Sequence, residues 1–186
     1  MKLETPIREL STIPSDELLN YDYNSITLHK ISYNDPQIDF IFEGSIVFPF
    51  IITPFGIDKL NLSENQKIFK NQDCPLFNLA ISEIKKIEKE LDATVKIATL
   101  SGIEPGGRIH KHFDTSPIFQ MCHRVHIPLV TSRDAIFTID DMEYFLEKGK
   151  CYEFDNTRYH SVFNNSKEAR IHLLIDLLPN NFVGTE

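Results

Sequence analysis

A long succession of short, alternating segments constrains this fold more than any other feature of the sequence. After Leu91, apolar and polar residues alternate with a period of two, and eight such segments follow one another up to residue 178. This alternation predicts β-strands that bury one side. The predicted strands are Thr94–Leu100, Arg108–Phe113, Arg124–Val130, Ala135–Ile139, Glu143–Leu146, Cys151–Phe154, Tyr159–Phe163 and Ala169–Leu178.

Turn residues separate these strands and leave no room for helices between them. The turns are Pro105-Gly106-Gly107, Asp140-Asp141, Lys148-Gly149 and Asn164-Asn165. A parallel α/β sheet needs a helix between successive strands, so the pattern argues against that class. We predict a mainly β fold with flanking helices, in which the core is a double-stranded β-helix of the jelly-roll or cupin type.

The first 93 residues predict strands and a supporting helix. The clearest helix begins near Pro75, where five apolar residues recur at helical spacing: Leu76, Ala80, Ile84, Ile87 and Leu91. The weaker predictions are a helix in Ser11–Asn20, a strand in Ser25–Tyr33, one or two strands in Phe40–Ile52 and a loop in Pro54–Gln72. We expect residues 1–186 to form a single domain, with these elements in 1–93 and the β core in 94–179.

Composition and charge exclude several classes of protein. The net charge of −8 argues against a nucleic-acid binder, which needs clustered Lys and Arg. The cysteines are odd in number and lack C-x-x-C spacing, which predicts reduced thiols at Cys74, Cys122 and Cys151. The first ten residues lack the apolar core of a signal peptide, and Ile46–Ile52 is too short to cross a bilayer. We therefore expect a soluble, cytoplasmic protein without nucleic-acid or membrane partners.

Two pairs of polar residues share strand faces in the β-rich half. His112 and Asp114 are two residues apart, so an extended strand directs both side chains to the same side. Arg124 and His126 have the same spacing and the same relationship. Each pair therefore has the parity needed to line one cavity.

Two further residues flank the predicted turn Asn164–Glu168. If the flanking strands pair antiparallel with Val162 opposite Arg170, then His160 and Arg170 lie diagonally on one face. This pairing allows two imidazoles, a carboxylate and two guanidinium groups to meet in one cavity. Two imidazoles and one carboxylate form the facial triad typical of non-haem Fe(II) oxygenases. Arg is better suited than Lys to bind a carboxylate, because its fork of donors matches two oxygens.

Four ordered motifs carry a resemblance to a known family. They read PGGRIHKHFD at 105–114, HRVHIPL at 123–129, FDNTRYHSVFN at 154–164 and RIHLLID at 170–176. From Ser101 to Asp176 the chain resembles the aspartyl/asparaginyl β-hydroxylase family of cupin-fold 2-oxoglutarate oxygenases. It looks closest to the branch that hydroxylates free L-proline at the cis-4 position.

The resemblance implies a metal site and a co-substrate pocket. Animal members of the family that modify peptides have Gly in place of Asp114, whereas this chain keeps the acid, so a full triad is expected. The implied iron ligands are His112, Asp114 and His160. The implied co-substrate residues are Arg170, which binds the distal carboxylate of 2-oxoglutarate, and with it Arg124, His126, Ser101 and Val162.

Several residues have plainer alternative interpretations. His110 and His123 share the ligands' parity, yet the family pattern gives them no ligand role, and His172 is expected to be buried and hydrogen-bonded. Arg124 could instead pair with an acid such as Asp155, and Ser101 beside a glycine could serve only turn chemistry. Asp155 and Asn156 either orient His160 or form an Asx turn, and Asp176 is expected to be structural.

These observations predict an Fe(II)- and 2-oxoglutarate-dependent dioxygenase. It would use dioxygen to hydroxylate an unactivated C–H bond of an amino acid, free or within a peptide, and would release succinate and carbon dioxide. The alternatives are a cupin metalloenzyme that does not use 2-oxoglutarate and a non-catalytic cupin that binds a small acid. The resemblance lies in the iron and co-substrate machinery, so it predicts neither the substrate nor the oligomeric state.

Overall fold

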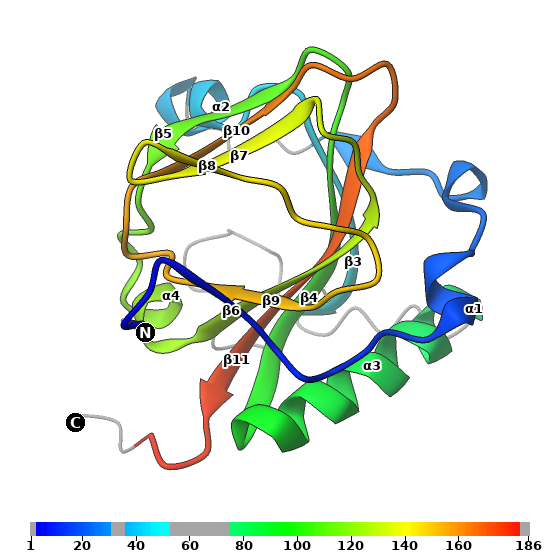
Figure 1. Ribbon diagram of the computed structural model, residues 1–186, viewed down its shortest axis with the longest axis vertical. Coiled ribbons are helices and arrows are strands. Elements are labelled where there is room, and N and C mark those ends of the chain that lie inside the picture. The colour runs from blue at the N-terminus through cyan, green and yellow to red at the C-terminus, as the bar shows by residue number, and fades with distance from the viewer. Residues whose placement is uncertain (1–2, 31–35, 53–74, 183–186) are drawn as a thin grey trace.

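Two antiparallel β-sheets face each other and enclose the interior of the protein (Figure 1). The computed structural model describes residues 3–30, 36–52 and 75–182. Within these ranges the elements are β1 (Ile7–Glu9), α1 (Asp16–Leu19), η1 (Tyr23–Ser25), β2 (His29–Lys30), α2 (Pro36–Ile41), β3 (Ser45–Ile52), α3 (Pro75–Leu91), β4 (Ala93–Ile103), β5 (Arg108–His112), α4 (Pro117–Met121), β6 (His123–Val130), β7 (Ala135–Ile139), β8 (Met142–Tyr144), β9 (Tyr152–Phe154), β10 (His160–Asn164) and β11 (Arg170–Pro179).

The larger sheet has the order β1-β9-β6-β11-β4-β3-β2 and the smaller one β5-β10-β7-β8 among the described residues. All eight strands predicted after Leu91 are present, with ends shifted by a few residues at most. From β4 to β11 the chain passes back and forth between the two sheets, with β7 and β8 paired within the small one, and this gives the predicted double-stranded β-helix. Strands β1 and β3 join the large sheet by pairing with β9 and β4, so the N-terminal half extends the same sheet.

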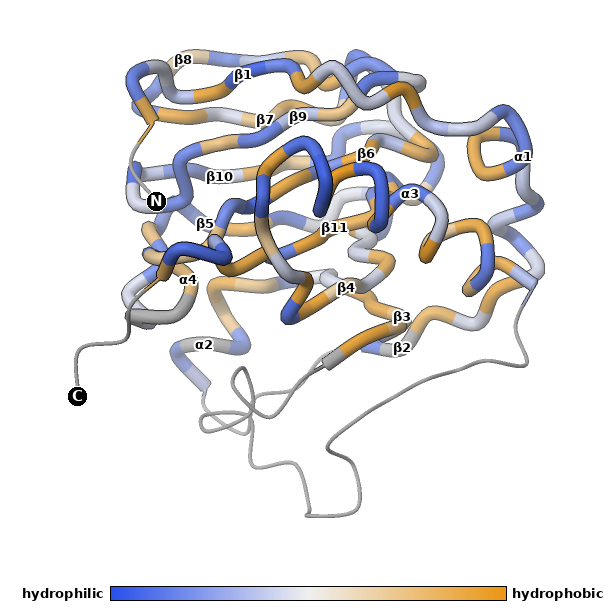
Figure 2. The backbone as a smooth tube through the Cα atoms, turned by 90° about the horizontal axis from the view of Figure 1, so that it is seen from below, coloured by the Kyte–Doolittle hydropathy of each residue, from blue (hydrophilic) through white to orange (hydrophobic). Residues whose placement is uncertain are grey.

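Helix α3 covers the outer face of the large sheet, as Figure 2 shows from below. It buries Leu76, Ala80, Ile84 and Ile87, which lie on one face because their spacing follows the helical repeat. They pack in one apolar cluster with alternate residues of the central strands, such as Leu173. Full burial of a leucine side chain contributes about 1.5–3 kcal/mol, so this layer fixes the helix to the sheet.

The opposite face of the large sheet points into the space between the sheets. A second apolar cluster there combines Ile103 and Phe154 from the large sheet with Phe137 and Val162 from the small one. Along β11, residues with even numbers share this inner face because side chains alternate along a strand. Arg170 is one of them, so a charged side chain points into the interior of the barrel.

The predicted pairing of the strands that carry His160 and Arg170 is wrong. Strand β10 pairs with β5 and β7, whereas β11 pairs with β4 and β6 in the other sheet. The side-chain amide of Asn164 donates to the carbonyl groups of Ile103, Glu104 and Glu168, at 2.8, 3.3 and 2.8 Å. These bonds anchor the connection that crosses from one sheet to the other, so no hairpin forms. His160 and Arg170 therefore lie on opposite sheets.

The predictions for the N-terminal half are only partly correct. The helix expected in Ser11–Asn20 is limited to α1, where the Ser15 hydroxyl caps Leu18 N. The strand expected in Ser25–Tyr33 is reduced to β2, and residues 31–33 lie outside the described residues, as does the predicted loop Pro54–Gln72. The start of Phe40–Ile52 belongs to α2, and β3 has an irregularity between Pro49 and Ile51. Strand β1 and helix α4 were not predicted.

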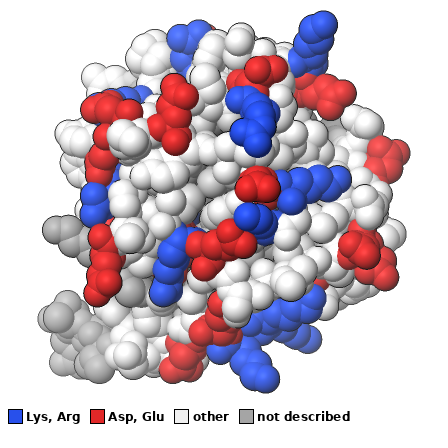
Figure 3. All heavy atoms as spheres, viewed as in Figure 1, with Lys and Arg blue, Asp and Glu red and all other residues white. Residues whose placement is uncertain are grey.

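Charged side chains of both signs lie on the surface (Figure 3), and two of the three cysteines are buried. Figure 3 shows acidic and basic side chains interspersed over most of the viewed face, with several basic side chains together near its lower edge. Cys122 and Cys151 are buried free thiols, and Cys74 lies outside the described residues. None of the helices in the described part of the chain is long and apolar enough to span a membrane.

Candidate metal centre

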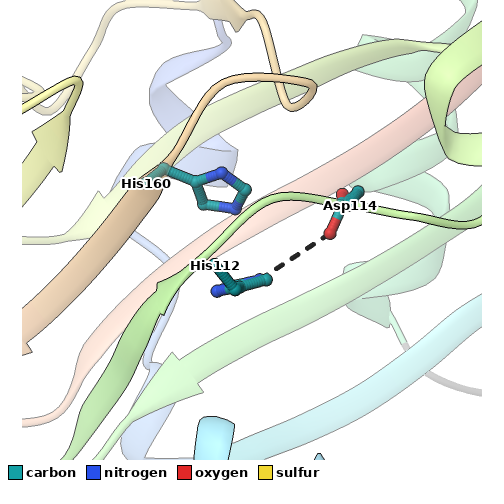
Figure 4. A group of neighbouring side chains, drawn as sticks. All are labelled: His112, Asp114 and His160. Carbon is teal, nitrogen blue, oxygen red and sulfur yellow. Dashed lines mark ion pairs between the residues drawn. The ribbon is translucent and has the colours of Figure 1, made fainter.

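Two strands of the small sheet bring the three predicted metal ligands together. His160 opens β10 and lies directly opposite His112, the last residue of β5, and Asp114 follows two residues later. One ligand atom of each lies within 4.8 Å of the others, and the two imidazole centroids are 4.4 Å apart. Figure 4 shows the three side chains converging, with the contact of 3.7 Å between His112 Nε2 and Asp114 Oδ1 dashed.

Backbone contacts determine which nitrogen of each imidazole is free. His112 Nδ1 lies 2.7 Å from the carbonyl oxygen of His110, and His160 Nδ1 lies 2.9 Å from that of Arg158. A carbonyl oxygen only accepts, so each Nδ1 carries the hydrogen and each Nε2 keeps its lone pair. Burial, with the nearby His112, lowers the pKa of His160 to about 4. This imidazole is therefore neutral at pH 7, as a metal ligand must be.

The environment of Asp114 keeps its carboxyl group ionised. Burial alone would raise its pKa, but Arg124, the histidines and a hydrogen bond from Asn156 outweigh burial and lower it. Its backbone N–H donates to the carbonyl oxygen of Asn156 at 3.0 Å, which holds the segment after β5 against the segment before β10. The group thus presents two neutral nitrogens and one negative oxygen, which is the donor set of a facial triad.

Arg124 lies between two carboxylates. Its Nε and Nη2 donate to the two oxygens of Asp176 at 2.7 and 3.0 Å, and its Nη1 donates to Asp114 Oδ2. The guanidinium carbon lies 4.7 Å from the centre of the Phe119 ring. Its acid partners are therefore Asp114 and Asp176, and not Asp155, which was the partner considered from the sequence.

Arg170 lies deep in the interior and has no acid partner among the described residues. It is 3% exposed, and burial alone lowers its pKa to about 9, so it is still charged at pH 7. Its Nη2 lies 3.0 Å from His172 Nδ1, and that nitrogen lies 3.2 Å from His126 Nδ1. An uncompensated buried charge is unfavourable, so this arrangement is suited to an anion that enters the barrel.

The two histidines beside Arg170 leave two ring nitrogens unpaired. Arg170 can only donate, so His172 Nδ1 accepts and the hydrogen of this ring is on Nε2. His126 Nδ1 lies 3.2 Å from the same atom, and a hydrogen bond between the two requires the hydrogen on His126 Nδ1 and a lone pair on His126 Nε2. Both Nε2 atoms are buried without a partner among the described residues, and burial keeps both pKa values well below 6.5. Unpaired buried polar atoms of this kind are rare, and here they mark a polar pocket.

Aromatic rings connect this pocket with the metal ligands. The Phe154 ring lies 5.2 Å from His160 and 5.0 Å from His126, measured between centroids. Ser101 lies opposite His172 in the sheet register and so shares the inner face, and Val162 is buried two residues beyond His160. The structure therefore places every residue predicted for the co-substrate pocket on the inner faces of the barrel. Arg124 differs from the others because two acids hold its guanidinium group.

The alternative candidates have other partners. The ring of His110 stacks on Phe40 at 4.2 Å, and His123 Nδ1 lies 2.7 Å from Glu153. Neither histidine belongs to the metal-binding group found among the described residues. Asp155 forms an Asx turn, because its Oδ1 accepts from Thr157 N at 3.0 Å.

Two residues near the ligands have contacts that the sequence did not predict. Asn156 donates to Asp114 Oδ2 at 3.0 Å instead of orienting His160, and Asp176 holds Arg124. For Asp176 the alternation along the strand could have indicated its position, because it lies six residues after Arg170 and therefore shares the inner face of β11. For Asn156 the sequence offered no signal of its partner, because Asp114 lies 42 residues earlier in the chain.

The double-stranded β-helix and the His-Asp-His group together define the class of non-haem Fe(II) oxygenases that use 2-oxoglutarate. Within this class, residues 59–179 match the sequence profile of aspartyl/asparaginyl beta-hydroxylase, which covers more than half of the chain. The chain belongs to the aspartyl/asparaginyl β-hydroxylase family. The predicted family is thus confirmed, whereas the free-proline cis-4-hydroxylase branch stays a prediction.

Solved structures with the same fold include three prolyl hydroxylases. The viral collagen prolyl hydroxylase of Paramecium Bursaria Chlorella virus-1, solved with 2-oxoglutarate, is 9% identical with a TM-score of 0.58, covering 94% of this chain and 96% of its own. A prolyl-4-hydroxylase of Pseudomonas putida is 12% identical with a TM-score of 0.55, covering 96% and 95%. A prolyl hydroxylase of Trichoplax adhaerens, solved with a peptide of hypoxia inducible factor, is 13% identical with a TM-score of 0.53, covering 87% and 74%. A search of curated protein sequences finds no match.

Proposed function

We propose that this protein is an Fe(II)- and 2-oxoglutarate-dependent dioxygenase that hydroxylates an unactivated C–H bond of an amino acid, free or within a peptide. The reaction would consume dioxygen and release succinate and carbon dioxide. One observation carries the proposal: Arg170, on the sheet opposite the His-Asp-His group, is buried and has no acid partner among the described residues. A metal site and an anion site that face each other across a barrel suit a co-substrate that chelates a metal at one end and carries a carboxylate at the other.

The residues present fit Fe(II). His112 and His160 would each bind it through Nε2, because the hydrogen of each ring is engaged by a backbone carbonyl group. Asp114 would supply the carboxylate. When bound, the iron would supply the activation of dioxygen that no protein side chain can perform.

Arg170 would bind the distal carboxylate of 2-oxoglutarate. The guanidinium group has no competing acid among the described residues, and His172 holds one of its nitrogens at 3.0 Å. The unpaired Nε2 hydrogen of His172 is a second donor in the same pocket, and Ser101 lies opposite this histidine. The co-substrate would thus relieve both the buried charge and an unpaired donor.

Apolar side chains would exclude water from the reacting end of the site. Phe42 lies edge-on to His112 with 5.4 Å between centroids, and Phe154 does the same to His160 at 5.2 Å. Val162 and Phe137 continue the apolar lining toward the small sheet. A dry site protects the chain from oxidation and strengthens the charge interactions inside it.

Two other functions remain as alternatives from different classes. A cupin metalloenzyme that does not use 2-oxoglutarate would have no use for Arg170, a buried guanidinium group without an acid partner among the described residues. A cupin that only binds a small acid would have no use for the metal-ligand group. The presence of both features in one barrel favours the oxygenase.

A spectroscopic titration followed by a turnover assay tests the proposal. Fe(II) and 2-oxoglutarate are added without oxygen, and the weak visible charge-transfer band is recorded; air is then admitted and succinate is measured. The expected result is a band that needs both additions, and succinate that rises when the correct amino acid is present. Metal-loaded protein that shows neither the band nor succinate would refute the proposal.

Arg170→Ala is the matched variant for the co-substrate role. We expect it to weaken 2-oxoglutarate binding strongly and to leave iron binding largely intact, because Arg170 lies on the opposite sheet from the metal ligands. Loss of iron in this variant would contradict the role. Screening the free amino acids for stimulated succinate release then identifies the substrate, with proline first because of the resemblance.

A further inference from the structure

The buried charges around Arg124 differ from those around Arg170. Arg124 and Asp176 lie directly opposite each other on β6 and β11, and their side chains form two parallel hydrogen bonds of 2.7 and 3.0 Å. A fork of this kind fixes the plane of the guanidinium group. Asp176 is 1% exposed, so the pair is part of the rigid inner face of the large sheet.

The third nitrogen of Arg124 reaches across to a metal ligand. Nη1 donates to Asp114 Oδ2, and Asn156 Nδ2 donates to the same oxygen at 3.0 Å. The other oxygen, Oδ1, is the one that faces His112 Nε2 at 3.7 Å. One oxygen of the carboxylate is therefore held by two donors, and the other is directed at the imidazole ligands.

The carboxylates of the chain itself engage Arg124, whereas none engages Arg170 among the described residues. Each of the three nitrogens of Arg124 donates to Asp114 or Asp176. Arg170 has no carboxylate beside it among the described residues, and it attracts one. The two arginines on the inner face of the large sheet thus have different electrostatic surroundings.

We infer that Arg124 is a positioning residue for the metal ligand Asp114, and that Asp176 and Asn156 complete this support. Arg124 and Asn156 both donate to Oδ2, so Oδ1 is the oxygen that would be offered to the metal. The inference rests on the proposed function, and it differs from the co-substrate role that the family resemblance implies for Arg124.

The test separates metal binding from co-substrate binding by using Co(II), which binds without turnover. The variant is Arg124→Lys, which keeps the charge but cannot bridge two carboxylates with a planar fork. Co(II) affinity is measured by competition with a chromophoric chelator, the visible Co(II) spectrum is recorded, and 2-oxoglutarate affinity is measured by calorimetry at saturating Co(II). Arg170→Met is the matched control, because it changes the other buried arginine.

The expected result for Arg124→Lys is a loss of Co(II) affinity of about tenfold or more, about 1.4 kcal/mol, together with a changed Co(II) spectrum. Its 2-oxoglutarate affinity should stay within about threefold of the wild type. Arg170→Met should show the converse pattern, with the wild-type Co(II) spectrum and strongly weakened 2-oxoglutarate binding. An unchanged Co(II) affinity and spectrum in Arg124→Lys, or a tenfold loss of 2-oxoglutarate affinity at saturating Co(II), would overturn the inference.

A second variant keeps the test decisive if Arg124→Lys does not fold. Asn156→Ala removes the other donor to Asp114 Oδ2 and leaves the buried charges in place. It should lower Co(II) affinity about threefold or more and alter the spectrum, and wild-type values for both would overturn the inference. If the wild-type chain binds no Co(II), the proposed function itself fails; if the wild type binds both ligands and the variants behave like it, only the role of Arg124 fails.

Discussion

Replacing Arg170 with methionine should make the ligand-free protein more stable, although it removes the residue proposed to bind the co-substrate. Arg170 is 3% exposed, and its one hydrogen-bond partner among the described residues is the neutral ring of His172. Methionine is apolar and flexible, so it fills most of the space of the arginine stem without bringing a charge into the barrel.

The magnitude follows from the pKa of Arg170. Burial lowers this pKa from 12.5 to about 9, which corresponds to about 5 kcal/mol against the charged form, since each pKa unit is worth about 1.36 kcal/mol. The folded pKa lies below the unfolded one, so this penalty is complete at pH 7, below both values. The variant also loses the hydrogen bond to His172, which lowers the stability gained by removing the buried charge by about 1.5–3 kcal/mol. The net expectation is an increase of about 2–3.5 kcal/mol in the free energy of unfolding, within the range seen when buried charges are replaced by apolar residues.

Urea unfolding of the metal-free protein at pH 7 measures this change. The chain has no Trp, so far-UV circular dichroism is the suitable signal. Arg108→Met is the control, because the Arg108 side chain is 46% exposed and should change stability by less than about 1 kcal/mol. Adding Mn(II) and 2-oxoglutarate at about 100 times the dissociation constant should stabilise the wild type by about 2.7 kcal/mol and the variant far less.

The reasoning is refuted if Arg170→Met is less stable than the wild type by more than about 1 kcal/mol. That result would mean that the guanidinium group is stabilised in the free protein, so its burial would not indicate an anion site. Equal stabilisation of both proteins by 2-oxoglutarate would separately contradict the binding role of Arg170.

Three further predictions concern other parts of the molecule. Burial keeps the pKa values of His126 and His172 well below 6.5, so between pH 7 and pH 5 the unfolded chain takes up protons that the folded chain does not. The free energy of unfolding should therefore fall as the pH is lowered from 7 to 5. Urea titrations in which it stays constant or increases over this range would contradict the prediction. Gly44→Ala places a Cβ 2.8 Å from a backbone atom of Gly107 at a φ of +75°, and it should lower the free energy of unfolding in urea by about 2–4 kcal/mol. Gly106→Ala, at a φ of +77° with open space around it, should lower it by about 1 kcal/mol. Equal losses in the two variants would rule out the steric explanation. Asp114→Ala should reduce Co(II) affinity by about a hundredfold or more in equilibrium dialysis, and near-normal affinity would exclude Asp114 as a ligand.

The strands were predictable from the sequence because alternation is a local signal. A strand with one buried face can be identified from about five residues, as β7 and β10 can, because their buried and partly exposed residues alternate. The partners of a strand are not encoded in this way. The pairing inferred for β10 and β11 was wrong because a short connection looks the same in the sequence whether it closes a hairpin or crosses to the other sheet. The hydrogen bonds of Asn164 that hold the crossing reach residues about 60 positions away in the sequence.

The same distinction applies to the site. His112 and Asp114 are close in sequence, and the ordered motifs identified them together with His160. The pairing of Arg124 with Asp114 and Asp176 depends on how three separate segments meet, so sequence reasoning left its partner open. Short elements were also difficult: α2 was read as part of a strand because Phe40 and Ile41 are apolar, and four to six residues carry too little periodicity to decide.

The division of the site between two sheets has a consequence for the choice of co-substrate. Two of the three metal ligands lie on the small sheet, and Arg170 lies on the large one. In the proposed function, a 2-oxo acid has to reach from one sheet to the other, so the separation of the sheets selects its chain length. An acid with one more methylene group would push the sheets apart against the contact of Phe137 with Phe154, whose ring centroids are 5.2 Å apart. Discrimination between 2-oxo acids of different length is then a property of how the two layers pack, and substitutions that never touch the acid should alter it.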